Sequence, residues 1–119
     1  MTIEQIEKKA SYLSYCKENY NKGIRPADIS CKNEDGYIKL VEIAKLYFAN
    51  NLLNKFASYL MEGHYLVYLW TAHFILEYGH PDEKLKQICL NEIKKYSDHP
   101  LLQDVAAQEK KWLDNHLGR

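Results

Sequence analysis

The segment from Tyr65 to Leu76, YLVYLWTAHFIL, constrains the fold of this chain more than any other stretch of its sequence. Thr71 and His73 are its only clearly polar residues, so a helix over this range is apolar on nearly every side. Such a helix is stable in water only when neighbouring elements cover most of its surface. The segment is also well short of the ~20 residues that a membrane span needs. The sequence therefore predicts a central, buried helix in a soluble protein.

Apolar residues repeat at three- and four-residue steps through the rest of the chain, and no strand pattern competes with them. The short connections between the later helices force successive helices to pack antiparallel, either as a compact bundle or as a short solenoid. The buried helix over residues 65–76 favours the solenoid. We expect one all-α domain over residues 1–119, because this length suits a single core and is too short for two. About six helices are predicted, over residues 2–21, 36–49, 52–62, 65–76, 82–96 and 100–116.

The charge balance disfavours nucleic-acid binding. Lys+Arg and Asp+Glu both number 16, and affinity for DNA or RNA comes largely from neutralising phosphates. Only Arg25 and Arg119 supply the planar guanidinium that suits phosphate and base recognition. The first 13 residues carry charges where a secretory signal needs a continuous apolar stretch. We therefore expect a cytoplasmic protein that binds neither nucleic acid nor membrane.

Residues 52–113 contain several packing motifs. They are YLWTAH from Tyr68 to His73, then Ile75-Leu76-Glu77, Pro81-Asp82, a helix with Leu85, Cys89, Leu90 and Ile93, and a closing AQEKKWL from Ala107 to Leu113. In these motifs the chain resembles a small bacterial family of HEAT-like alpha-alpha superhelical domains of uncharacterised function. Relatives typically have Ala at the position of Thr71. The resemblance implies a short HEAT-like alpha-alpha superhelix. Some members of such families are similar to immunity proteins, which neutralise a toxin by binding it.

His73, Glu77 and His80 are the candidate metal ligands. His73 and Glu77 are four residues apart and share a helix face, and His80 follows just past the helix end. The zinc-hydrolase pattern, two histidines four apart with a glutamate between them, is absent. Packing explains the same residues: a partly buried His73 bonded to a neighbour, with Glu77 at the rim. We favour packing, and we predict no metal and no cofactor.

Cysteine chemistry offers little support for an enzyme. The chain has three cysteines, an odd number, and they lack the paired spacing of disulfide or zinc sites. They are Cys16, Cys31 and Cys89. Cys31 lies in a polar loop beside Lys32 and would be reactive if its pKa were lowered, but no partner base can be assigned. We expect it to be a free surface thiol. No catalytic residue is predicted.

The ten tyrosines are the least ordinary feature of the composition. A tyrosine joins a large apolar ring to a polar tip, which suits both the edges of a core and binding surfaces. Most are expected at core edges. Tyr12, Tyr15 and Tyr59 fit their apolar stripes less well, so we expect them to be exposed. They are predicted binding residues, together with three residues on the outer face of helix 82–96, namely Lys84, Gln87 and Asn91.

Two classes of function remain. The first is a non-enzymatic helical module that binds another protein, with an immunity protein against a toxin as one form. The second is a metal-binding or enzymatic helical domain that uses His73, Glu77 and His80, or the Cys31 loop. We favour the first, because catalytic motifs are absent and tyrosine is abundant. The sequence does not predict an oligomeric state.

Overall fold

The protein is all-α, as the sequence predicts. The computed structural model describes residues 1–98 and 100–116, and every regular element in these ranges is helical. The α-helices are α1 (Ile3–Lys9), α2 (Tyr12–Lys22), α3 (Asp35–Ala49), α4 (Leu53–Ala57), α5 (Val67–Phe74), α6 (Glu83–Asp98) and α7 (Gln103–His116). Two 3₁₀ turns, η1 (Ile29–Cys31) and η2 (Ser58–Met61), and a π-helical turn, η3 (Ile75–Gly79), complete them.

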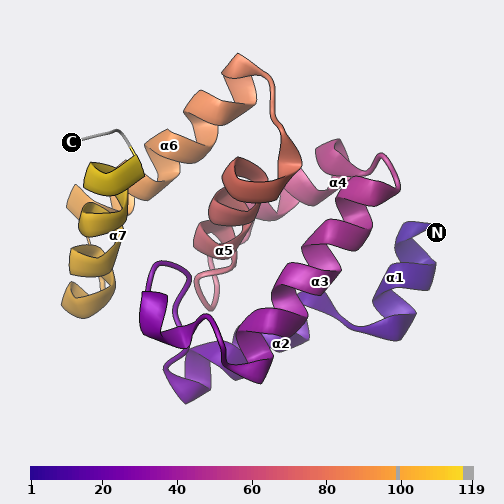
Figure 1. Ribbon diagram of the computed structural model, residues 1–119, viewed down its shortest axis with the longest axis horizontal. Coiled ribbons are helices and arrows are strands. Elements are labelled where there is room, and N and C mark those ends of the chain that lie inside the picture. Colours follow the sequence, from indigo (N-terminus) through magenta and orange to yellow (C-terminus); the bar gives the residue numbers. More distant parts are fainter. Residues whose placement is uncertain (99, 117–119) are drawn as a thin grey trace.

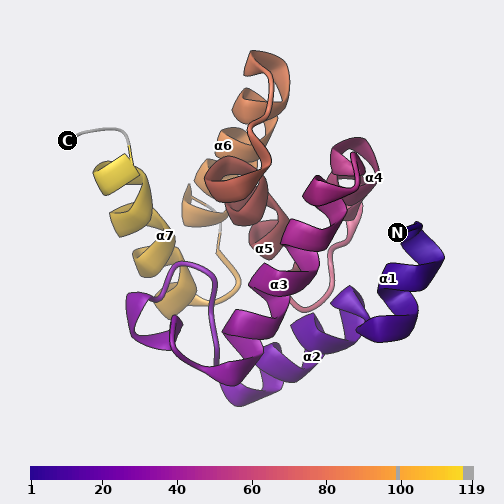
Figure 2. The ribbon, with the colours of Figure 1, turned by 45° about the vertical axis from the view of Figure 1, so that its right-hand side comes forward.

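Helix α5 lies in the middle of the molecule, with α3 on one side and α6 on the other (Figures 1 and 2). Helix α7 packs beside α6, and the backbone N–H of Leu102 in their connection donates to the Tyr96 hydroxyl at 3.2 Å. The Cα radius of gyration is 13.5 Å, which is about the value for a compact chain of this length. The helices therefore pack as a compact globule, while the HEAT-like superhelix stays a prediction.

The prediction that neighbours cover the central helix is confirmed. Every residue of α5 is buried except Tyr68, which is half-buried. Trp70 is fully enclosed, and its ring meets that of Tyr37 from α3 edge-on, with centroids 5.1 Å apart. The Tyr12 hydroxyl of α2 lies 3.0 Å from Oγ1 of Thr71. Successive positions of α5 thus contact different helices, as an element without a polar face requires.

Helix α5 is shorter than the predicted span of 65–76. It begins at Val67 because Tyr65 and Leu66 both adopt the left-handed conformation, with φ values of 55° and 60°. Such a conformation costs non-glycine residues energy and interrupts a right-handed helix. After Phe74 the chain continues as η3, and His80 ends this turn with a φ of 50°. The break predicted at Asn50-Asn51 is confirmed, since Asn51 is left-handed with a φ of 59°.

The largest departure from prediction lies at the N-terminus, where one helix was expected over residues 2–21. The chain instead breaks at Ala10 and Ser11, both of which are extended. The Ser11 side chain accepts a hydrogen bond from the Ser14 N–H at 3.3 Å, which caps a new helix. The side of α2 that faces the core is therefore not the one that a continuous helix from α1 would present. The buried residues of α2 are Tyr12, Cys16 and Asn19. In one continuous helix, the spacing from Ile6 and Ala10 would place Leu13 in the core, but Leu13 is 40% exposed.

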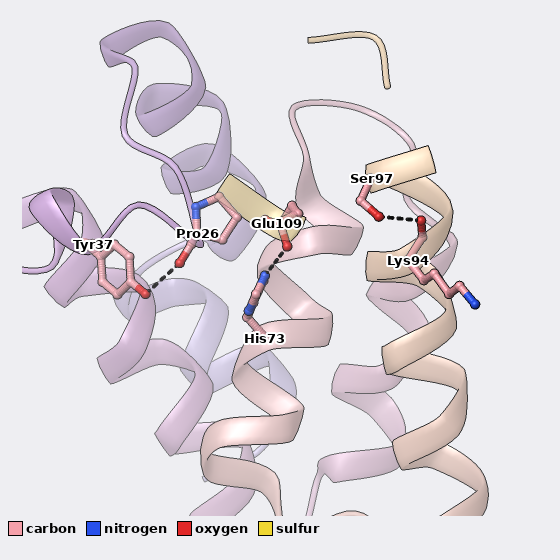
Figure 3. Close-up of polar contacts among 6 residues, drawn as sticks. All are labelled: Pro26, Tyr37, His73, Lys94, Ser97 and Glu109. Atoms are coloured by element: carbon pink, nitrogen blue, oxygen red, sulfur yellow. Dashed lines mark hydrogen bonds and ion pairs between the residues drawn. The ribbon is translucent and has the colours of Figure 1, made fainter. Parts of the chain in front are cut away.

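The loop between α2 and α3 is anchored to the globule. The Tyr37 hydroxyl donates to the carbonyl oxygen of Pro26 at 3.0 Å (Figure 3).

In the part of the chain that the structure describes, no helix has the length and apolar character to cross a membrane.

Candidate functional site

The outer face of α6 carries three of the predicted binding residues. Lys84, Gln87 and Asn91 are all exposed, and their spacing places them on one side of the helix. Ile88 lies among them and is 41% exposed. The three-residue spacing from Leu85 predicts that Ile88 is buried in the core, and this prediction is wrong. Adjacent residues of a helix point about 100° apart, so Cys89 faces the core while Ile88 faces solvent. The buried stripe of α6 consists of Cys89, Ile93 and Tyr96.

A groove of about 350 Å³ lies beside this face, between α4 and the start of α6. Leu85 and Ile88 form part of its apolar lining on the α6 side, and Asp82 and Lys84 bring opposite charges to it. Leu53, Asn54 and Ala57 of α4 form the other wall. We call these residues together with Gln87 and Asn91 the α4/α6 surface. Its apolar centre and polar margin are the arrangement found at protein–protein interfaces.

Local sequence explains how this surface is built. The Asp82 side chain accepts a hydrogen bond from the Leu85 N–H at 2.9 Å, which caps α6 and fixes the angle at which the helix starts. Pro81 precedes this cap, in agreement with the predicted helix start. The Gln87 amide donates to Glu83 Oε1 at 3.2 Å within the same helix. The polar residues of the face are thus held on a regular helix.

The predicted exposure of Tyr12 is wrong, and the predicted tyrosine set does not form one surface. Tyr12 is fully buried, because the break at Ser11 rotates it toward α5. Burial raises the pKa of its hydroxyl, so it stays protonated. Tyr59 is half-buried, and its hydroxyl lies 3.1 Å from that of Tyr47. Tyr15 is also half-buried. These three residues belong mainly to the packing of α2, α3 and η2.

The candidate metal ligands do not converge. Nε2 of His73 lies 2.6 Å from Oε1 of Glu109 on α7, and both side chains are shielded from solvent (Figure 3). Glu77 is half-buried in the π-helical turn, and His80 is exposed beyond it. Glu77 lies in a π-helical turn, which is wider than an α-helical one, so the α-helical spacing from which a shared face was predicted does not continue from His73 to Glu77. Within residues 1–98 and 100–116, no group of three His, Cys, Asp or Glu side chains could hold a metal ion.

Sequence reasoning missed Glu109, although the sequence contains a signal for it. Val105, Glu109 and Trp112 are four and three residues apart, so the carboxylate occupies the middle of the apolar stripe of α7. A charged residue at such a position is buried and needs a partner. His73 is that partner, and the Trp112 ring covers it edge-on with centroids 4.5 Å apart. The pair is a packing feature without access to a substrate.

Cys31 is not the surface thiol that the sequence predicts. It is 9% exposed because η1 folds it inward, and its Sγ donates to Asp28 Oδ2 at 3.4 Å. Burial raises its pKa, and the neighbouring carboxylate adds to this rise. Burial likewise raises the pKa of Cys89 to about 12. A nucleophilic thiol needs the opposite shift, so these cysteines are unreactive core residues.

Comparison of this chain with protein-family models, with curated proteins and with solved structures gives no match. The HEAT-like family therefore stays a prediction from the packing motifs of residues 52–113.

Proposed function

We propose that this protein is a non-enzymatic module that binds another protein through the α4/α6 surface. The observation that carries this proposal is the exposed Ile88 at the centre of Lys84, Gln87 and Asn91. Binding becomes more favourable when a partner removes exposed leucine, isoleucine or aromatic side chains from water. The polar neighbours supply hydrogen bonds and exclude mismatched partners.

The chemistry of the remaining side chains supports a binding role over an enzymatic one. The thiols of Cys31 and Cys89 have raised pKa values, which disfavours nucleophilic attack at neutral pH. His73, the best candidate for a general base, is enclosed with Glu109 and has no open side toward solvent. Proton transfer to a substrate requires contact at hydrogen-bond distance.

A toxin is the narrower expectation for the partner, and it depends on the HEAT-like resemblance alone. The balanced charge of the chain, 16 basic and 16 acidic residues, favours a protein partner over a nucleic acid. Co-expression with a toxin encoded by a neighbouring gene would test the narrower form. The toxin hypothesis is supported if the unmodified chain restores growth of cells that express the toxin and Ile88→Asp does not.

The α4/α6 surface is tested by site-specific photo-cross-linking in cells. A photo-reactive amino acid at Gln87 or Asn91 should capture a protein partner, whereas the same group at Lys39 of α3 should not. Ile88→Asp should abolish this capture. Ile38→Asp is a matched control, because Ile38 is 42% exposed on α3 and Ile88 is 41% exposed. The proposal fails if Gln87 and Asn91 capture nothing above Lys39, or if Ile88→Asp leaves the cross-link intact.

A further inference from the structure

A second apolar surface lies around the connection from η2 to α5, and none of its lining residues belongs to the α4/α6 surface. Its exposed apolar residues are Leu13 at 40%, Met61 at 89%, Tyr65 at 37% and Leu101 at 90%. Three adjoining hollows share residues of this connection and so form one continuous region. We call it the Tyr65 surface. Contiguous exposed apolar patches mark interaction sites.

The backbone holds Tyr65 outward. Tyr65 and Leu66 are consecutive left-handed residues, and Leu66 is 6% exposed, so one side chain anchors the connection in the core. The Tyr65 ring packs edge-on against Tyr20 with centroids 5.6 Å apart. Strained backbone of this kind persists where the surrounding structure enforces it, and it concentrates at binding sites. The connection thus presents a fixed aromatic side chain, which reduces the entropy lost on binding.

The charges of one hollow indicate what binds there. A groove of about 340 Å³ has Leu13 and Lys17 of α2 on one wall, and Glu62, Tyr65 and Val67 on the other. Lys17 Nζ lies over the Tyr65 ring, 5.7 Å from its centroid, and Glu62 brings the opposite charge to the same groove. The groove therefore carries a cation and an anion beside an apolar centre. Glu62 Oε1 accepts hydrogen bonds from the N–H and ring of His64. Among the residues that the structure describes, neither Lys17 Nζ nor Glu62 Oε2 has a hydrogen-bond or ion-pair partner.

We infer that the Tyr65 surface binds a second copy of this chain in a two-fold symmetric dimer. In such an interface the same patch faces itself, so each contact occurs twice. Lys17 of each copy then meets Glu62 of the other across the packed Leu13 and Tyr65 side chains. Two copies also carry no net charge to repel each other, since each has 16 basic and 16 acidic residues.

Charge reversal tests this dimer without disturbing the core. Sedimentation equilibrium should show a concentration-dependent dimer for the unmodified chain. Lys17→Glu alone places two carboxylates at each contact, and Glu62→Lys alone places two ammonium groups there. Each variant should weaken the dimer by about tenfold or more, because like charges replace opposite ones at both contacts. Lys86→Glu, which changes the net charge equally on exposed α6, should have no effect.

The decisive sample is an equal mixture of Lys17→Glu and Glu62→Lys. In the mixed dimer both contacts again join opposite charges, so dimerisation should return to near that of the unmodified chain. Circular dichroism should show that each variant keeps its helical content. A monomeric unmodified chain at high concentration overturns the inference. Single variants that dimerise normally, or a mixture that stays monomeric, also overturn it. These outcomes are independent of Ile88→Asp, so failure here leaves the α4/α6 surface untouched.

Discussion

Nε2 of His73 lies 2.6 Å from Oε1 of Glu109, and this contact between two buried side chains joins the central helix α5 to α7. Removing one partner of a buried pair leaves the other without compensation. We expect Glu109→Ala to lower the free energy of unfolding by about 3–5 kcal/mol. Urea denaturation followed by circular dichroism measures this change.

The exposed pair of His64 and Glu62 is the natural control, because it has a similar geometry, 2.8 Å, at the surface. Under monomeric conditions Glu62→Ala should lower the free energy of unfolding far less than Glu109→Ala does, because solvent screens the exposed pair. The double variant His73→Leu/Glu109→Met should recover much of the stability that Glu109→Ala loses, since apolar side chains leave no unpaired polar group. Equal effects of Glu109→Ala and Glu62→Ala would contradict the burial of the pair.

Trp70 should be the most sensitive apolar position of α5. It is fully buried against Tyr37 and Phe74, so Trp70→Ala leaves a large cavity and should cost about 3–5 kcal/mol. Its Nε1 has no hydrogen-bond partner among the described residues, so Trp70→Phe loses no hydrogen bond and should cost less. Thermal unfolding compares the two variants. A near-silent Trp70→Ala would mean that the ring does not belong to the core.

Ser11 should stabilise the start of α2 through its side chain. Ser11→Ala removes the acceptor for the Ser14 N–H and should cost about 1 kcal/mol. Ser14→Ala alters an exposed hydroxyl in the same turn and should stay within about 0.5 kcal/mol. Chemical denaturation of the two variants gives the comparison. A larger effect at Ser14 than at Ser11 would exclude this cap.

The stability of the protein should fall in alkaline solution. Burial raises the pKa of Cys89 to about 12, whereas an unfolded thiol ionises near 8.5. Above about pH 8.5 the unfolded chain loses a proton that the folded chain keeps, so the free energy of unfolding decreases as pH rises. Cys89→Ala should reduce this slope between about pH 9 and 10, by up to about 1.4 kcal/mol per pH unit. An unchanged slope would show that Cys89 ionises alike in both states.

The sequence predicted the helical class and the buried central helix because both depend on local patterns. An apolar run such as Leu66 to Trp70 has no alternative to burial in water. The polar face of Lys84, Gln87 and Asn91 follows from helical periodicity alone. The break at Asn50-Asn51 was predictable because asparagine tolerates the left-handed conformation.

The features that the sequence did not reveal depend on a single cap or on distant contacts. The cap at Ser11 shifts the phase of α2, which moves Tyr12 into the core and Leu13 to the surface. The partner of His73 is 36 residues away, so spacing within one helix pointed to Glu77 instead. Tyr65 and Leu66 adopt the left-handed conformation although neither is a glycine or an asparagine, so their residue types do not indicate it. Tertiary packing overrides local preference at such positions.

The separation of His73 and Glu109 along the chain also affects how this protein is synthesised. Helices α1 to α5 leave the ribosome first, but His73 and the apolar surface around it stay uncovered until α7 follows. Synthesis proceeds at about 5–20 residues per second, so the 36 residues from His73 to Glu109 take roughly 2–7 s. During this interval the most apolar helix of the protein is incompletely covered, and nascent chains are then most exposed to aggregation and to chaperone capture.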